Sequence, residues 1–296
     1  MLYHYTSIPA MESILKDAVT RGTMCFWATR YDCFADDKEY RLGVETIRRL
    51  LPMVEQGLPE DRQVAKDFDW KLIEGNVNLP YPYIVSLSAR PDNEYMWSKY
   101  AKKDGVVLEV DDSVFVPNQE LTMMMLKPCL YAGLLSYEEL TKQIMDEYTN
   151  GGLALLKGPM GKDAFELLEK QPQVFVRLIA MYLLTFVATR VKDKEYYKEE
   201  ETRVIIQSQR SEIAQLVKAN RDIIQNALHL DPDALEQAMQ QEKMRQRVDK
   251  TIFYRDCHIS IKMLRAVYVR PEYQGQVKEV IQRLVLGEIP VHVINQ

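Results

Sequence analysis

Leu2-Tyr3-His4-Tyr5-Thr6-Ser7 opens the chain and has the alternation of a β-strand that leads into a helix. Side chains alternate between the two faces of a strand, so His4 shares its face with Leu2 and Thr6. Residues 8–18 then carry apolar side chains at helical spacing, and Thr6 or Ser7 is available as the N-cap. The opening therefore predicts a strand, a cap and a helix.

Patterns typical of strands and helices continue along the rest of the chain. Strand-forming runs bounded by turn residues predict strands at residues 23–29, 83–88, 106–110, 197–207, 253–262 and 266–269. Apolar residues at helical spacing predict helices at about 42–54, 93–102 and 272–286. Strands separated by helical stretches of uneven length favour an α+β fold over regular βαβ winding.

We expect a single α+β domain over residues 1–296, because a chain of this length can bury a large core. A mainly helical insertion is predicted at about 136–190, where Ser136 and Glu139 have the spacing of a capping box. A further helical pair is predicted at about 211–245 and divides near Asp231-Pro232.

The composition favours a globular protein that binds a small ligand or another protein. Hydrophobic residues make up 47% of the chain, yet no apolar run approaches the ~20 residues of a membrane span. The first residues lack the pattern of a signal peptide, so we expect a cytoplasmic protein without membrane contact. The net charge of −5 removes the general attraction that basic proteins have for phosphate backbones.

Sequence motifs for metals and for phosphate-binding loops are missing. The four cysteines are scattered, without a C-x-x-C pair or a histidine at metal-ligand spacing, so we expect reduced thiols and no metal site. His258 falls in a predicted strand, where a core or hydrogen-bonding role is favoured. Neither G-x-G-x-x-G nor G-x-x-x-x-G-K-[ST] occurs, which removes the main support for Rossmann and P-loop folds.

The run Glu199-Glu200-Glu201-Thr202-Arg203 is the clearest chemical constellation. In a strand, Glu199, Glu201 and Arg203 share one face. Like charges side by side cost energy unless a cation or ligand compensates, and Arg203 can hold one carboxylate while the other points into a pocket. The alternative interpretation is a solvated edge strand.

Hydroxyl groups and aromatic rings form a second constellation. Ser86 and Ser88 lie on one face of their predicted strand. Trp97 and Tyr100 share a face of the predicted helix, where they form a wall for a planar ring or pack in the core. The same two interpretations, ligand contact or structural hydrogen bond, apply to His4.

In their order along the chain, these motifs resemble an uncharacterised bacterial family, a domain of unknown function, that opens with L-x-H-Y-T-S and an I-L helix. The matching residues are 2–7, 14–15, 27–32, 36, 39, 86–88, 96–101, 105 and 199–203. One loop departs from the family pattern, because the usual N-D-P is replaced by Ala35-Asp36-Asp37.

That family in turn resembles a distant branch of the ADP-ribosyltransferase superfamily, which implies a split mixed sheet with a helical insertion and NAD as substrate. By this resemblance, His4 bonds a ribose hydroxyl, Ser88 braces the site and Tyr100 or Trp97 stacks near nicotinamide. Glu201 is the catalytic acid, whose carboxylate stabilises oxocarbenium charge on the ribose, and Glu199 orients the nucleophile. The expected NAD contacts are His4, Tyr5, Thr6, Ser88, Trp97, Tyr100 and Arg203.

Three functions remain open from the sequence. The first is an NAD-consuming transferase or glycohydrolase with a protein, nucleic acid or water as acceptor, in a setting such as a toxin or phage defence. The second is a non-catalytic nucleotide-binding or regulatory module on the same scaffold. The third is a nucleic-acid enzyme in which Glu199, Glu201 and Asp36 bind Mg²⁺. For the first, we expect Glu201→Gln to leave the fold intact and to lower NAD turnover about 10²- to 10³-fold.

Overall fold

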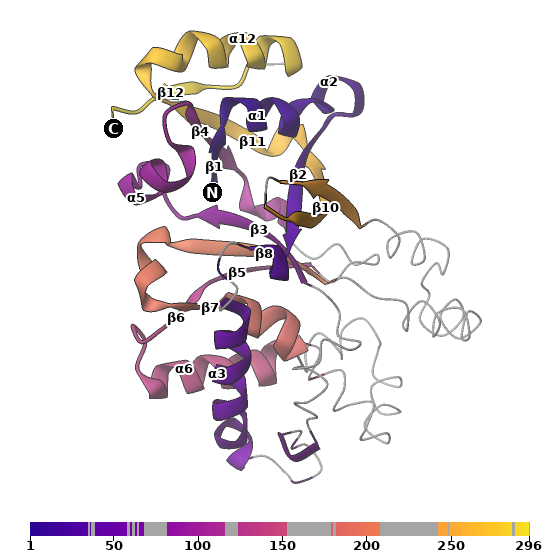
Figure 1. The fold of residues 1–296 in the computed structure, drawn as a ribbon, viewed down its shortest axis with the longest axis vertical. Helices are drawn as coiled ribbons and strands as arrows, with labels where there is room; N and C mark the ends of the chain where they lie inside the picture. The colour runs from indigo at the N-terminus through magenta and orange to yellow at the C-terminus, as the bar shows by residue number, and fades with distance from the viewer. Residues whose placement is uncertain are drawn as a thin grey trace, which may run out of the picture.

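The computed structural model describes residues 1–34, 36, 39–57, 60, 63, 65–67, 82–115, 124–152, 179, 182–207, 242–247, 249–285 and 288–295. These residues form a mixed α+β fold, in which helices lie above and below a mostly antiparallel sheet (Figure 1). The α+β class predicted from the sequence is confirmed at this level. Within these residues, no helix combines the length and the apolar character that a membrane crossing requires.

Ten of the described strands belong to one sheet. They are β1 (Leu2–Ser7), β2 (Thr23–Arg30), β3 (Pro82–Ser88), β4 (Gly105–Val110), β5 (Met124–Pro128), β8 (Glu201–Gln207), β9 (Lys243–Gln246), β10 (Thr251–Ser260), β11 (Leu264–Val269) and β12 (Val291–Val293). The main path runs in the order β12-β11-β4-β1-β3-β2-β10-β9, and β8 joins β3 to β5. Neighbours are antiparallel except β11 and β12. A separate parallel pair consists of β6 (Leu130–Ala132) and β7 (Val191–Asp193).

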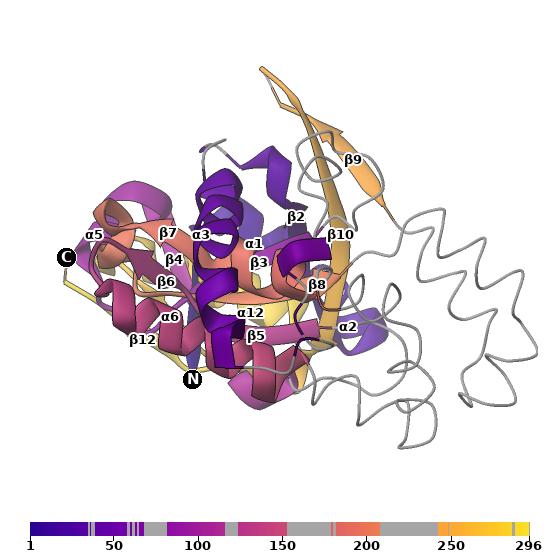
Figure 2. The same ribbon diagram turned by 90° about the horizontal axis from the view of Figure 1, so that it is seen from below.

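The main sheet splits into two arms at β3. One edge of β3 pairs with β8 along the whole strand. Within the described residues, the other edge pairs with β1 only at Ser88 and with β2 only at Tyr83 and Ile84. The arm β1-β4-β11-β12 and the arm β2-β10-β9 therefore leave from opposite ends of β3, and the sheet is open between β1 and β2. Figure 2 shows the β9–β10 hairpin extending beyond the other strands.

Two apolar cores lie on opposite faces of β8. The first lies between the sheet and the helices α1 (Ile8–Leu15), α2 (Ala18–Arg21) and α12 (Gln274–Leu284). The second joins α3 (Glu39–Val54) and α6 (Tyr137–Asp146) to residues 182–190, below β8 and β5 in Figure 1. Because side chains alternate along a strand, Val204 and Ile206 belong to the first core and Ile205 to the second.

A third apolar cluster fastens the segment after β3 onto β1. Tyr5 packs edge to face against Trp97, with ring centroids 5.9 Å apart. The Tyr5 hydroxyl donates to the carbonyl oxygen of Arg90 at 2.6 Å and accepts from the backbone N–H of Asn93 at 3.1 Å. Asn93 caps α5 (Glu94–Met96), which continues as a π-helical turn over Trp97–Ala101. These contacts fix the position of the π-helical turn beside β1.

Most predicted elements are present in the structure. The strands predicted at 23–29, 83–88, 106–110, 253–262 and 266–269 and the helices predicted at 42–54 and 272–286 are confirmed to within a few residues. The helix predicted at 8–18 divides into α1 and α2 and ends at Gly22, whose φ of 66° suits a glycine C-cap. Within the predicted insertion, residues 137–152 and 182–190 are helical, and 153–178 lie outside the described residues.

Two predicted elements need correction. The strand predicted at 197–207 begins only at Glu201, because Lys194–Glu199 form a 3₁₀-helix and Glu200 has a φ of 46°. Residues 243–246, predicted as the end of a helical pair, form β9, where they pair with β10. The rest of that helical pair, 211–241, lies outside the described residues.

Candidate functional site

A cleft of about 1580 Å³ occupies the opening between β1 and β2. Its walls include α1 on one side of the sheet and the segments 99–100 and 192–199 on the other. Pockets of 300–1,000 Å³ hold most small-molecule ligands, so this cleft has room for a dinucleotide. The split in the sheet thus creates a cleft that can take a ligand.

Most of the residues proposed from the sequence line this one cleft. Segments far apart in the chain contribute them: the first strand, the π-helical turn and the start of β8. The lining members are His4, Tyr5, Thr6, Tyr100, Glu199, Glu201 and Arg203. Ser88 and Trp97 lie outside the lining.

His4 sits at the opening of the sheet. Its Nδ1 lies 3.1 Å from the carbonyl oxygen of Ser86, and its ring packs edge to face on Phe26 with centroids 5.0 Å apart. Burial lowers the pKa of His4, and the bond to Ser86 offsets this only in part, so the imidazole is neutral near pH 7. Because a carbonyl oxygen only accepts, the proton lies on Nδ1 and Nε2 is an acceptor.

Glu201 lies on an interior strand, which excludes the solvated edge strand considered above. Its side chain is held by Arg203, with Nε 2.9 Å from Oε1, and by Lys192, with Nζ 2.7 Å from Oε2. Burial alone would raise the pKa of Glu201, but the ion pairs with Arg203 and Lys192 outweigh burial and place the pKa well below the ordinary value. The carboxylate is therefore ionised and strongly paired in the resting protein.

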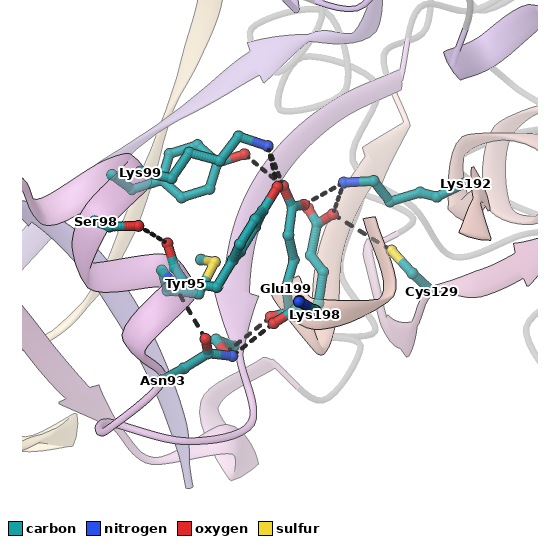
Figure 3. Close-up of polar contacts among 12 residues, drawn as sticks. Asn93, Tyr95, Ser98, Lys99, Cys129, Lys192, Lys198 and Glu199 are labelled. Atoms are coloured by element: carbon teal, nitrogen blue, oxygen red, sulfur yellow. Dashed lines mark hydrogen bonds and ion pairs between the residues drawn. The ribbon is translucent and has the colours of Figure 1, made fainter. Parts of the chain in front are cut away.

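Glu199 joins the same cluster from outside the strand. It ends the 3₁₀-helix before β8, and the left-handed Glu200 turns the chain between the two buried carboxylates. Glu199 accepts from Lys192 at 2.5 Å, from Lys99 at 2.8 Å and from the Tyr100 hydroxyl at 2.7 Å. Figure 3 shows Lys99 and Lys192 approaching Glu199 from opposite sides.

Lys99 and Lys192 are residues of the carboxylate cluster that sequence reasoning missed. Lys99 lies inside the Met96–Ala101 motif, and the need for a cation to compensate Glu199 was the signal that could have found it. Burial alone would lower the pKa of Lys99, but hydrogen bonds to Glu199 and Tyr95 raise it. Lys192 is on β7, and its sequence surroundings carry no comparable signal.

The aromatic wall differs from the predicted one. Trp97 is 1% exposed and belongs to the third apolar cluster, whereas Tyr100 is 44% exposed and lines the cleft. The π-helical turn separates the two rings, so the shared helix face predicted for them is wrong. Burial and then the neighbouring Glu199 carboxylate raise the pKa of the Tyr100 hydroxyl, which stays protonated.

Ser88 and Tyr5 act on the backbone around the site. Ser88 is fully buried, and its hydroxyl donates to the carbonyl oxygen of Glu199 at 3.0 Å. The Tyr5 hydroxyl is engaged by the backbone of residues 90 and 93. Both side chains therefore fix the segments that present Glu199 and Tyr100, while Thr6 lines the cleft from β1.

An arginine of the β9–β10 hairpin faces the same cleft. The buried Nε of Arg245 has no hydrogen-bond partner within the described residues, and its guanidinium lies 4.7 Å over the Trp27 ring. Burial and the nearby Arg247 lower the pKa of Arg245. A buried donor next to a second cation favours an anionic ligand at this end of the cleft.

The structure bears on the carboxylates that the third hypothesis assigns to Mg²⁺. Within the described residues, Glu199, Glu201 and Asp36 are not a group whose ligand atoms are close enough to hold one ion. The group that does meet this condition is Cys25, Asp256 and His258, on β2 and β10. Pairing of distant strands brings these three together, which sequence spacing could not reveal.

Comparison with protein-family models, curated proteins and solved structures finds no match to this chain.

Proposed function

We propose that this protein is an ADP-ribosyltransferase-like enzyme that binds NAD in the cleft between β1 and β2 and cleaves the nicotinamide–ribose bond. One observation carries the proposal. The residues that the family resemblance assigns to NAD come from distant segments, yet His4, Thr6, Tyr100, Glu201 and Arg203 line a single cleft large enough for a dinucleotide.

The chemistry of the lining supports these roles. The Nε2 of neutral His4 can accept a hydrogen bond from a ribose hydroxyl, and the exposed ring of Tyr100 offers a surface for a planar base. The unpaired Nε of Arg245 suits a phosphate oxygen. Ionised Glu201 supplies the negative charge that a developing oxocarbenium ion requires. The proposed acceptor of the ADP-ribose group is either water or a macromolecule.

A second candidate, nucleotide binding without cleavage, is favoured by the pairing of the two carboxylates. Lys192 and Arg203 neutralise Glu201, and Lys99 and Lys192 neutralise Glu199. A carboxylate held in this way stabilises a substrate cation only if Lys192 releases Glu201, while it keeps its bond to Glu199, when NAD binds. A module that holds ADP-ribose needs no such movement.

The deciding experiment is nicotinamide release from NAD by the purified full-length chain, with His4→Ala compared with His292→Ala. His292 is an exposed histidine on β12 and does not line the cleft. We expect release by the wild type, and a loss of about tenfold in kcat/KM for His4→Ala from one missing hydrogen bond. His292→Ala should match the wild type.

Calorimetry with ADP-ribose separates the two candidates. Binding of ADP-ribose without nicotinamide release would favour the non-catalytic module. Absence of binding for both NAD and ADP-ribose would contradict both candidates. Nucleic-acid cleavage that a chelator abolishes would instead support the metal-dependent enzyme considered from the sequence.

A further inference from the structure

Three side chains of metal-ligand type meet on the β2–β10 arm. Cys25 on β2 is the direct cross-strand partner of His258 on β10, and Asp256 lies two residues before His258. Side chains alternate along each strand, so the three project from the same face of the sheet. Their ligand atoms, a thiol sulfur, a carboxylate oxygen and an imidazole nitrogen, all lie within 4.8 Å of one another.

This face of the arm is separate from the apolar core. The neighbouring side chains Phe26 and Cys257 point to the opposite face and belong to the first core. Cys25 is buried, whereas the side chains of Asp256 and His258 are 18% and 38% exposed. A cation can therefore enter from solvent while the sulfur stays shielded.

We propose that Cys25, Asp256 and His258 form a zinc site with a water molecule as the fourth ligand. Zinc prefers four ligands of sulfur, nitrogen and oxygen type, and three protein ligands plus water is a common set. Zinc bond lengths of about 2.0–2.3 Å place tetrahedral ligand atoms roughly 3.3–3.8 Å apart. The 3.6 Å between His258 Nε2 and Asp256 Oδ2 already falls in this range.

The remaining adjustment is small because both strands are fixed. Seven consecutive cross-strand pairs, including Cys25 with His258, hold β2 against β10, so only side-chain rotations are needed to close the site. Binding of the ion releases the thiol proton of Cys25 to solvent and leaves a thiolate bonded to zinc.

A bound ion has to displace Lys243 from the Asp256 carboxylate or share that carboxylate with it. It forms an ion pair with Asp256 through Oδ2, the oxygen that faces His258. The Lys243 side chain is 52% exposed, so its ammonium group can turn into solvent when a divalent ion arrives. In the metal-free protein, Lys243 thus compensates the Asp256 carboxylate in place of the ion.

The test uses reduced, metal-free, full-length protein. Zinc is titrated in competition with a chromophoric chelator, and cobalt(II) is added separately as a spectroscopic substitute. We expect one equivalent of zinc to bind, and the cobalt form to show a thiolate-to-cobalt charge-transfer band in the near ultraviolet.

Substitutions at the proposed ligands test which side chains bind the metal. Cys25→Ser should abolish the charge-transfer band, and His258→Ala should weaken zinc binding at least about 100-fold, since loss of even an outer-shell partner costs 10–100-fold. Cys33→Ser and His292→Ala are matched controls from other parts of the chain and should leave both readouts unchanged.

Absence of zinc binding in the competition assay would overturn the proposal. A charge-transfer band that persists in Cys25→Ser, or an unchanged affinity in His258→Ala, would overturn it as well. If the buried Cys25→Ser substitution fails to fold, the partly exposed His258→Ala variant still decides the outcome.

Discussion

Burial of Glu201 changes the effect that its replacement should have on stability. From the sequence, its replacement by glutamine was expected to leave the fold intact. In the structure it is 4% exposed and pairs with Lys192 and with Arg203, which is 2% exposed. Removing its charge leaves two cations undercompensated in a buried environment, so that expectation has to be revised.

We therefore predict that Glu201→Gln lowers the free energy of unfolding by about 3–5 kcal/mol, the cost of breaking a buried ion pair. Glu200→Gln is the matched control, because Glu200 pairs with Arg90 in an exposed position and such pairs contribute about 0–1 kcal/mol. Urea unfolding of both variants measures the difference. Equal small effects would show that the Glu201 cluster contributes little to stability.

The same residue predicts a pH dependence. The pKa of Glu201 is lowered in the folded protein from its ordinary value of 4.5, so the unfolded chain takes up this proton first as the pH falls. The stabilisation is therefore present above about pH 4.5 and is lost as the pH falls below that value. Unfolding free energies measured from about pH 7 to about pH 3 should fall less steeply in Glu201→Gln than in the wild type. Parallel curves for the two proteins would contradict this assignment.

At the scale of elements, the close approach of β4 to the π-helical turn controls where Tyr100 lies. A Cβ atom at Gly105 would lie 2.3 Å from the carbonyl oxygen of Ala101, at the end of that turn. Backbone atoms cannot yield as a flexible side chain can, so only glycine fits here. The position of the Tyr100 ring in the cleft thus depends on a residue outside it.

Gly105→Ala is accordingly predicted to destabilise the protein by about 1–3 kcal/mol through overpacking. Gly275→Ala in α12 is the control, because its Cβ would meet nothing within 4 Å, and it should stabilise the helix by up to about 1 kcal/mol. Thermal unfolding of the two variants should shift in opposite directions. A shift in the same direction for both would argue against the close contact.

Local sequence patterns predicted the secondary-structure elements well, but they predicted poorly which side chains from different elements contact one another. The alternation of residues 2–7 and the capping at Ser7 and Ser136 depend on near neighbours, and all of these predictions are confirmed. The break before β8 was missed because Glu200, a non-glycine residue, adopts a positive φ. The contact of Cys25 with His258 arises from strand pairing across a long stretch of chain, whereas Lys192 meets Glu201 across the 3₁₀-helix Lys194–Glu199 and the turn at Glu200. The alternation of side chains along a strand encodes neither contact.

At the scale of the whole molecule, both arms of the sheet contribute residues to the cleft. A ligand bound there contacts only the folded protein, so it should stabilise the protein against global unfolding. At a concentration about 100 times its Kd, ADP-ribose is predicted to add about 2.7 kcal/mol to the free energy of unfolding. Thermal unfolding with and without ADP-ribose measures this gain. Arg245→Gln should reduce the gain at the same ligand concentration, because the Nε donor, which lacks a hydrogen-bond partner within the described residues, would no longer meet the phosphates.

Arg265→Gln provides the control for that measurement. Arg265 lies on β11, pairs with Asp111 in an exposed position and does not line the cleft. It should retain the full stabilisation by ADP-ribose. An undiminished gain in Arg245→Gln would place the phosphates elsewhere.

The opening of the sheet at β3 also has a consequence for the time course of amide hydrogen exchange. Within the described residues, β1 bonds to β4 along one edge but meets β3 only at Tyr3 on the other. Every second amide from His4 to Ser7 therefore faces the cleft instead of a neighbouring strand. Slow and fast exchange should alternate residue by residue along this one strand, and a ligand that fills the cleft should slow the fast amides first.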